Sequence, residues 1–128
     1  MWIASRWGWY SVVLKGGNGK EWQVRARVRN DLLNLIAAAK LEGQKVIESS
    51  DSDYRFRIIV DQEQLGCVFK ALEDSIDYGN FKSKIGQIRG QEKHLAKYHR
   101  IWSLMSELQP SGSYSSRVSR FPRVAGKN

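Results

Sequence analysis

The stretch that decides the fold is Trp22-Gln23-Val24-Arg25-Ala26-Arg27-Val28-Arg29. Apolar and polar residues alternate along it, which is typical of a strand with one buried face and one polar face. Val24, Ala26 and Val28 are expected to face a hydrophobic core. The three arginines between and after them then project from the opposite side, because successive side chains of a strand point to opposite faces of the sheet.

A second alternating stretch, residues 9–14, precedes this strand and ends at Gly16-Gly17-Asn18-Gly19. A glycine-rich loop between two alternating stretches predicts a β-hairpin. Residues 1–6 either add a short strand of their own or extend the first strand across Gly8 as a bulge. The residues alone leave both readings open.

Downstream, the apolar spacing becomes helical, and Asn30 or Asp31 can cap a helix that ends near Gly43. Residues 45–48 are expected to form a short edge strand. Residues 54–60 alternate again, and Asp61 can cap a second helix after them. A third helix over residues 91–108 carries an apolar stripe that is expected to face inward.

This order, β-β-α-β-β-α plus a C-terminal helix, predicts an α+β fold with an antiparallel or mixed four-stranded sheet and helices on one face. It is the order of a permuted ferredoxin-like domain. The strands 22–29 and 54–60 are expected to lie adjacent and parallel, because each is followed by a helix that crosses the same face. A generic open-faced α/β sandwich is the alternative. One domain is expected over residues 1–108, followed by a flexible basic Ser/Gly/Arg tail over 109–128.

The chain has 128 residues, with 21 lysines and arginines against 13 acidic residues and a formal net charge of +8. This excess favours polyanionic partners. The single cysteine, Cys67, excludes an intramolecular disulfide. No apolar run approaches the length of a membrane span, so we expect no membrane partner and a cytoplasmic location. Oligomeric state cannot be inferred.

If strand 54–60 lies beside strand 22–29, five guanidinium groups share one face of the sheet. Such a cluster of like charge is repulsive unless an anion compensates it. Arginine suits phosphate, and an exposed sheet with an aromatic such as Trp9 can stack bases, although no aromatic RRM consensus is present. The alternative is a solvated face paired with Glu21, Glu48 and Asp53. The candidate nucleic-acid-binding residues are Arg25, Arg27, Arg29, Arg55, Arg57, Lys82, Lys84, Arg89, Arg100, Trp9 and Tyr78.

The segment from Asp77 to Lys82 is rich in turn formers, which explains it structurally, while Tyr78, Asn80 and Lys82 could instead contact phosphate. The two histidines, His94 and His99, are five residues apart and lie on different faces of a regular helix, so they make a poor metal pair. No catalytic residue, metal or cofactor is predicted.

The sequence resembles a family of short hypothetical proteins of bacteria and phages to which no activity is assigned. The resemblance covers roughly residues 1–108 and implies no mechanism. It rests on Trp2-Ile3, Tyr10-Ser11-Val12-Val13, Val24-Arg25-Ala26-Arg27-Val28-Arg29, Asp31-Leu32, Asp53-Tyr54-Arg55-Phe56-Arg57, Ile76-Asp77-Tyr78-Gly79-Asn80-Phe81-Lys82 and Tyr98-His99-Arg100-Ile101-Trp102.

The charge pattern therefore predicts a non-enzymatic module that binds a polyanion, above all RNA or DNA, through the arginine-rich sheet face and the basic tail. A protein-interaction adaptor or accessory subunit that recognises an acidic protein surface is the alternative. A small nucleotide- or RNA-processing enzyme comes third.

Overall fold

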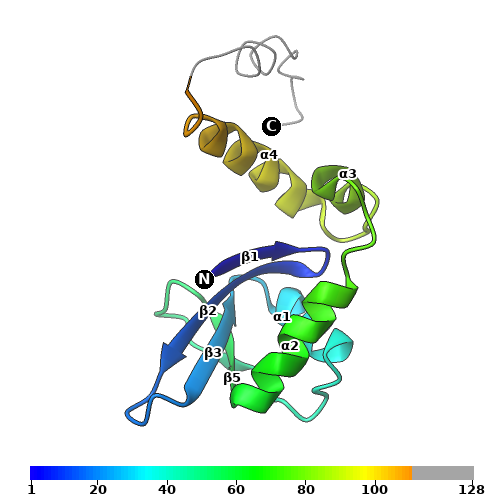
Figure 1. Ribbon diagram of the computed structural model, residues 1–128. Helices are drawn as coiled ribbons and strands as arrows, with labels where there is room; N and C mark the ends of the chain where they lie inside the picture. Colours follow the sequence, from blue (N-terminus) through cyan, green and yellow to red (C-terminus); the bar gives the residue numbers. More distant parts are fainter. Residues whose placement is uncertain (111–128) are drawn as a thin grey trace. The chain divides into compact units, whose positions relative to one another are not determined.

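The computed structural model describes residues 1–110, and the chain divides into two compact units, Met1–Gly79 and Asn80–Asn128. The first unit is an α+β fold, as predicted. Its elements are β1 (Trp2–Ser5), β2 (Gly8–Lys15), β3 (Glu21–Ala26), α1 (Arg29–Ala38), β4 (Ile47–Glu48), β5 (Phe56–Val60) and α2 (Gln62–Asp74) (Figure 1). In the second unit the described elements are α3 (Phe81–Ile85) and α4 (Glu92–Ser106).

The sheet has five strands in the order β1-β2-β3-β5-β4, and every neighbouring pair is antiparallel. The prediction of four strands is wrong, because residues 2–5 form a strand of their own that pairs with β2. Gly8 starts β2 with a positive φ of 152°, a backbone conformation that favours glycine. Of the two readings left open for the N-terminus, the separate strand is the one observed.

The prediction that the two central strands are parallel is also wrong. In β3 and β5, Ala26 lies opposite Phe56 and Trp22 lies opposite Val60, which is an antiparallel register. The short strand predicted over 45–48 explains the error: α1 returns the chain to β4, which runs in the direction of β3, and β5 then reverses and pairs antiparallel with both. The permuted ferredoxin-like arrangement, which was inferred from the order of the elements, is not confirmed.

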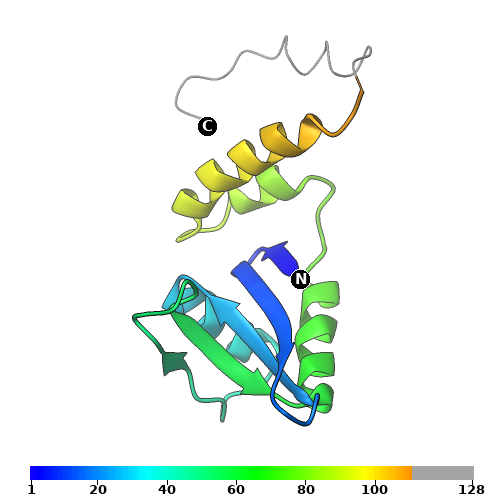
Figure 2. The same ribbon diagram turned by 90° about the vertical axis from the view of Figure 1, so that its left-hand side faces the viewer.

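The hydrophobic core lies between one face of the sheet and helices α1 and α2. Val24 of β3 and Ile58 of β5 are fully buried there, as the alternation predicts, and they pack with Tyr10, Leu32 and Val68. Figures 1 and 2 show both helices on the same side of the sheet. Within residues 1–79, no helix lies on the other side, which we call the open face.

The two longer helices of this unit begin differently. At α2, the Asp61 carboxylate accepts the Gln64 backbone N–H at 2.8 Å and the Gln64 side chain accepts the Asp61 N–H at 3.0 Å, so the predicted cap is confirmed as a capping box. At α1, neither Asn30 nor Asp31 is the cap. Val28 occupies that position without a side-chain bond, and Asp31 is buried within the first turn.

In the second unit, α3 was not predicted. Asn80 caps it by accepting the Ser83 backbone N–H at 2.9 Å, which gives this polar residue a structural role. Tyr98 of α4 is buried, and its ring centroid lies 5.2 Å from that of Phe81. Further along, Met105 is 58% exposed and Leu108 is 76% exposed, so the prediction of an inward apolar stripe is wrong for the C-terminal half.

Two further predictions concern the C-terminal tail and the bounds of the domain. Most of the tail predicted over 109–128 lies outside the described residues, and the prediction of one domain over 1–108 stays a prediction. Across residues 1–110, none of the helices combines the length and the apolar character that crossing a membrane requires.

Candidate nucleic-acid interface

One residue from each strand forms a row across the open face. Pairing places Trp2 opposite Ser11, Ser11 opposite Arg25, Arg25 opposite Arg57, and Arg57 opposite Ile47. Directly opposed residues of antiparallel strands project from the same face. Two arginines therefore stand side by side at the centre of the sheet, as the alternation predicts.

Both arginines are half-buried and held by neutral acceptors. Arg25 donates from Nη2 to Ser11 Oγ at 2.7 Å. Arg57 donates from Nη1 to Gln23 Oε1 at 3.1 Å, and from Nη2 to Ser52 Oγ at 2.5 Å and the Tyr54 carbonyl at 3.1 Å. Arg25 thus reaches across to β2, whereas Arg57 bridges β3 and the segment that precedes β5. These bonds fix the side chains without neutralising their charge.

Tyr54 adds an aromatic surface to the cluster. Tyr54 is buried but is not a member of the hydrophobic cluster around Val24 and Ile58, and two guanidinium groups contact its ring. The central carbon of Arg25 lies 4.6 Å from the ring centroid, and that of Arg27 lies 4.1 Å from it. Such cation–π contacts orient arginine but leave its charge in place. Arg25, Arg27, Arg57 and Tyr54 are called the arginine cluster below.

The charge of the arginine cluster is uncompensated within the described residues. None of its three arginines forms an ion pair there, and the Nε atoms of Arg25 and Arg57 are buried without a hydrogen-bond acceptor. Two nearby arginines differ, because Arg55 pairs with Glu48 at 2.9 Å and Arg6 pairs with Asp77 at 3.2 Å. The unit therefore carries compensated and uncompensated arginines side by side.

Trp2 and Trp9 lie next to the cluster on the open face. Trp9 is directly opposite Ala4, two residues from Trp2, and the two indole centroids are 5.8 Å apart with planes inclined at 50°. Trp2 is 72% exposed. An exposed indole at a sheet surface offers a flat apolar ring to a ligand.

Not all five predicted arginines share the open face. Strand β3 ends at Ala26, so Arg27 lies beyond it and Arg29 opens helix α1. Strand β5 begins at Phe56, so Arg55 precedes it and turns to Glu48. The prediction of five arginines on one face is wrong, because the strand signal was extended past both strand ends.

Several residues of the interface were not predicted. Trp2 was missed because the existence of β1 was undecided, and Tyr54 was missed because it belongs to the alternating stretch 54–60, in which only the arginines were considered as binding residues. Ser11, Gln23 and Ser52 are ordinary polar residues that become arginine acceptors only through strand pairing. The one signal available in the sequence was an aromatic residue beside Arg55 and Arg57.

A buried carboxylate positions the edge of the interface. Asp31 is 1% exposed, and its Oδ2 accepts the Trp9 backbone N–H at 3.1 Å. The Tyr10 hydroxyl donates to the Asp31 carbonyl at 2.6 Å. Gly8 leaves room for this carboxylate, since a Cβ there would lie 2.5 Å from Oδ1 and closer still to Cγ. Asp31 therefore anchors the start of β2 to helix α1.

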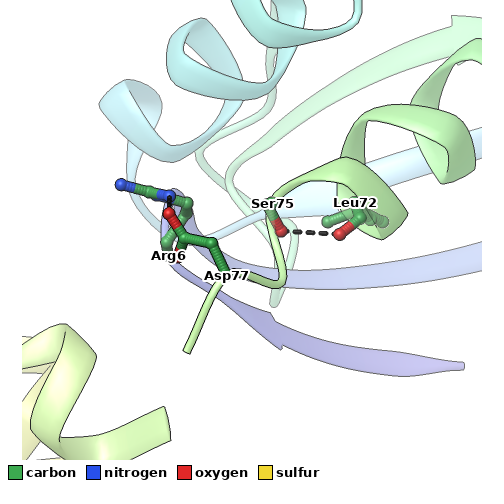
Figure 3. A network of polar contacts seen from close by, with 4 residues as sticks. All are labelled: Arg6, Leu72, Ser75 and Asp77. Carbon is green, nitrogen blue, oxygen red and sulfur yellow. Dashed lines mark hydrogen bonds and ion pairs between the residues drawn. The ribbon is translucent and has the colours of Figure 1, made fainter. Parts of the chain in front are cut away.

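The segment after α2 has a structural explanation (Figure 3). Asp77 forms the ion pair with Arg6, and Ser75 closes the helix by donating from Oγ to the Leu72 carbonyl at 2.6 Å. Tyr78 follows and is half-buried. These contacts tie the β1–β2 turn to the end of α2, in agreement with the structural reading of this stretch.

The remaining predicted binding residues belong to the second unit. Lys82 lies with Nζ 4.4 Å from the centroid of the Trp102 ring, and burial lowers its pKa. Lys84 is half-buried, whereas Arg89 and Arg100 are exposed. Within residues 1–110, no group of three or more His, Cys, Asp or Glu side chains could hold a metal ion.

Comparison with known protein families, curated proteins and solved structures finds no match for this chain. Its function is therefore inferred from the geometry of the open face.

Proposed function

We propose that the protein binds nucleic acid without catalysis, and that Arg25 and Arg57 on the open face of the sheet, together with Arg27 just beyond the end of β3, contact the phosphates. The observation that carries this proposal is the absence of any acidic partner for Arg25, Arg27 and Arg57 among the described residues. Directly opposed like charges destabilise a sheet. A bound polyanion would remove that repulsion.

The chemistry of the cluster suits phosphate. Guanidinium groups present planar sets of N–H donors that match phosphate oxygens, and such charge-assisted bonds are stronger than neutral ones. Arg25 and Arg57 are already oriented by neutral acceptors, and Arg27 is exposed. The formal charge of +8 adds long-range attraction for a polyanion.

The test compares two double variants that remove the same charge. Arg25→Gln with Arg57→Gln removes uncompensated arginines, and Arg6→Gln with Arg55→Gln removes arginines that already pair with acids. Glutamine keeps an N–H donor for the neutral acceptors. Fluorescence anisotropy with labelled 12-nucleotide DNA and RNA is measured at several salt concentrations, and circular dichroism checks folding.

Three phosphate contacts predict that log K falls with log salt with a slope of about −2 for a single strand. Between 50 and 200 mM salt this corresponds to roughly 20-fold weaker binding. The first double variant should reduce the slope by about 1.4, since each lost contact changes it by about 0.7. The control should change it far less. Equal effects of the two variants, or a wild-type slope near zero, would refute the proposal.

A protein-interaction adaptor remains the second candidate because of a different observation. At the end of α4 and just beyond it, Ile101, Leu104, Met105 and Leu108 are exposed. Exposed apolar side chains that gather in one place mark interaction surfaces. An adaptor predicts a partner that stays bound after nuclease treatment and at high salt, and Leu104→Ser with Met105→Ser should release it.

A further inference from the structure

We infer that the open face selects single-stranded nucleic acid over duplex, with an unpaired base stacked on Trp2 while the neighbouring phosphate contacts Arg25. This inference rests on the proposed function and specifies its ligand. It is carried by the position of Trp2 in the same cross-strand row as Arg25 and Arg57.

The geometry brings an indole and a guanidinium close together. In the row, Ser11 is the residue between Trp2 and Arg25. Two strand spacings, roughly 10 Å, separate the backbones of Trp2 and Arg25. The guanidinium shortens this separation, because its Nη2 reaches over β2 to Ser11 Oγ at 2.7 Å. Ser11, which lies between the two in the row, is 2% exposed.

Of the two tryptophans, Trp2 exposes its ring and Trp9 supports it. Trp9 is half-buried and lies against Trp2 with a centroid distance of 5.8 Å. Its backbone N–H is held by Asp31 at 3.1 Å, so the support of the pair is fixed. Trp2 remains 72% exposed. An exposed indole near the uncompensated charge of Arg25 fits a ligand that has both a flat ring and an anionic group.

A nucleotide with an unpaired base has both of these parts. Bases of a duplex are stacked on their neighbours, and their ring faces become available only after unstacking, which costs a few kcal/mol. Proteins that bind single strands combine a basic surface with aromatic side chains on which bases stack. Inorganic polyphosphate has the anionic groups but no ring. Trp2 should therefore discriminate, whereas the arginine cluster should not.

The experiment uses the full chain and three probes of matched length: a 12-nucleotide oligo-dT, a 12-base-pair duplex and inorganic polyphosphate. Anisotropy is measured for the labelled oligo-dT, and the other two probes compete with it. Trp2→Ala should weaken oligo-dT binding roughly 5- to 150-fold, the range expected for losing one stacked base. Trp2→Phe should recover most of the loss. Competition by duplex and polyphosphate should be unchanged by either substitution.

Ile59→Ala is the matched control, because Ile59 is an exposed apolar residue on the open face, opposite Gln23, and has no aromatic ring. It should change oligo-dT binding less than twofold. If Trp2→Ala weakens all three probes equally, or if Ile59→Ala costs as much, base stacking is refuted while the arginine proposal stands. If the Arg25→Gln, Arg57→Gln variant binds every probe as the wild type does, the proposed function fails as well.

Discussion

Replacing Gly8 by alanine tests how the edge of the open face is held in place. Gly8 has a φ of 152°, and a Cβ at this position would lie 2.5 Å from Oδ1 of Asp31, where ordinary contact begins near 3.4 Å. The neighbour is a buried side chain in the first turn of α1 and has little room to move. The carboxylate must therefore leave the Trp9 backbone N–H, or β2 must shift.

The expected loss of stability combines the cost of a lost hydrogen bond and the cost of backbone strain. A buried donor left without its acceptor costs about 1–3 kcal/mol. A non-glycine residue held in a sparsely populated backbone conformation costs about 1–3 kcal/mol as well. Together they predict a loss of roughly 2–6 kcal/mol in the free energy of unfolding. A unit of this size has a total of about 4–12 kcal/mol at the usual stability per residue.

Urea unfolding followed by tryptophan fluorescence measures this loss, because Trp7 and Trp9 flank the substituted glycine. Gly66→Ala is the control, since Gly66 lies in α2 with nothing within 4 Å of the added Cβ. That variant should gain about 0.5–1 kcal/mol, because alanine is the better helix former. A loss of less than about 1 kcal/mol in the free energy of unfolding for Gly8→Ala would show that the position of Asp31 does not require a glycine at residue 8.

Three further outcomes are expected. Asp61→Ala removes the capping box with Gln64 and should lower the free energy of unfolding by about 0.5–2 kcal/mol in the same urea assay, whereas no change would contradict a role for the cap. Tyr54→Phe should change the free energy of unfolding by less than about 0.5 kcal/mol, whereas Tyr54→Leu should lower it by about 1–2 kcal/mol because both cation–π contacts are lost. Equal losses for the two variants would contradict a contribution from these contacts. The pKa of Lys82 in the folded protein should lie below the ordinary lysine value of 10.5, and carbon NMR of its Cε can measure it. Because the unfolded chain then binds more protons than the folded chain, the contribution of Lys82 to the free energy of unfolding should increase as the pH rises toward 10.5. A decrease over this pH range would contradict the prediction.

The arginine pair at the centre of the sheet was predictable, because alternation fixes which residues of one strand share a face. Arg25 and Arg57 lie on the face opposite the core as that rule requires. Alternation does not report where a strand ends, and for this reason Arg29 was placed on the sheet when it begins a helix.

Alternation predicts neither the direction of β5 relative to β3 nor the existence of β1. A helix that crosses a sheet returns the chain to a strand in the original direction. Here that strand is the two-residue β4, and the chain reverses once more before β5, so β5 runs against β3. Trp2 and Tyr54 were missed as interface residues because their positions depend on pairing and on contacts beyond a strand end, which no local pattern encodes.

The arginines of the open face lose their conformational freedom when the chain folds. A flexible arginine that must be ordered by its ligand contributes up to about 2 kcal/mol of entropy against association. Here the bonds from Arg25 and Arg57 to Ser11, Gln23 and Ser52 restrict both side chains in the absence of any ligand. The face is therefore preorganised, and a phosphate that reaches it meets donors whose ordering entropy has already been lost.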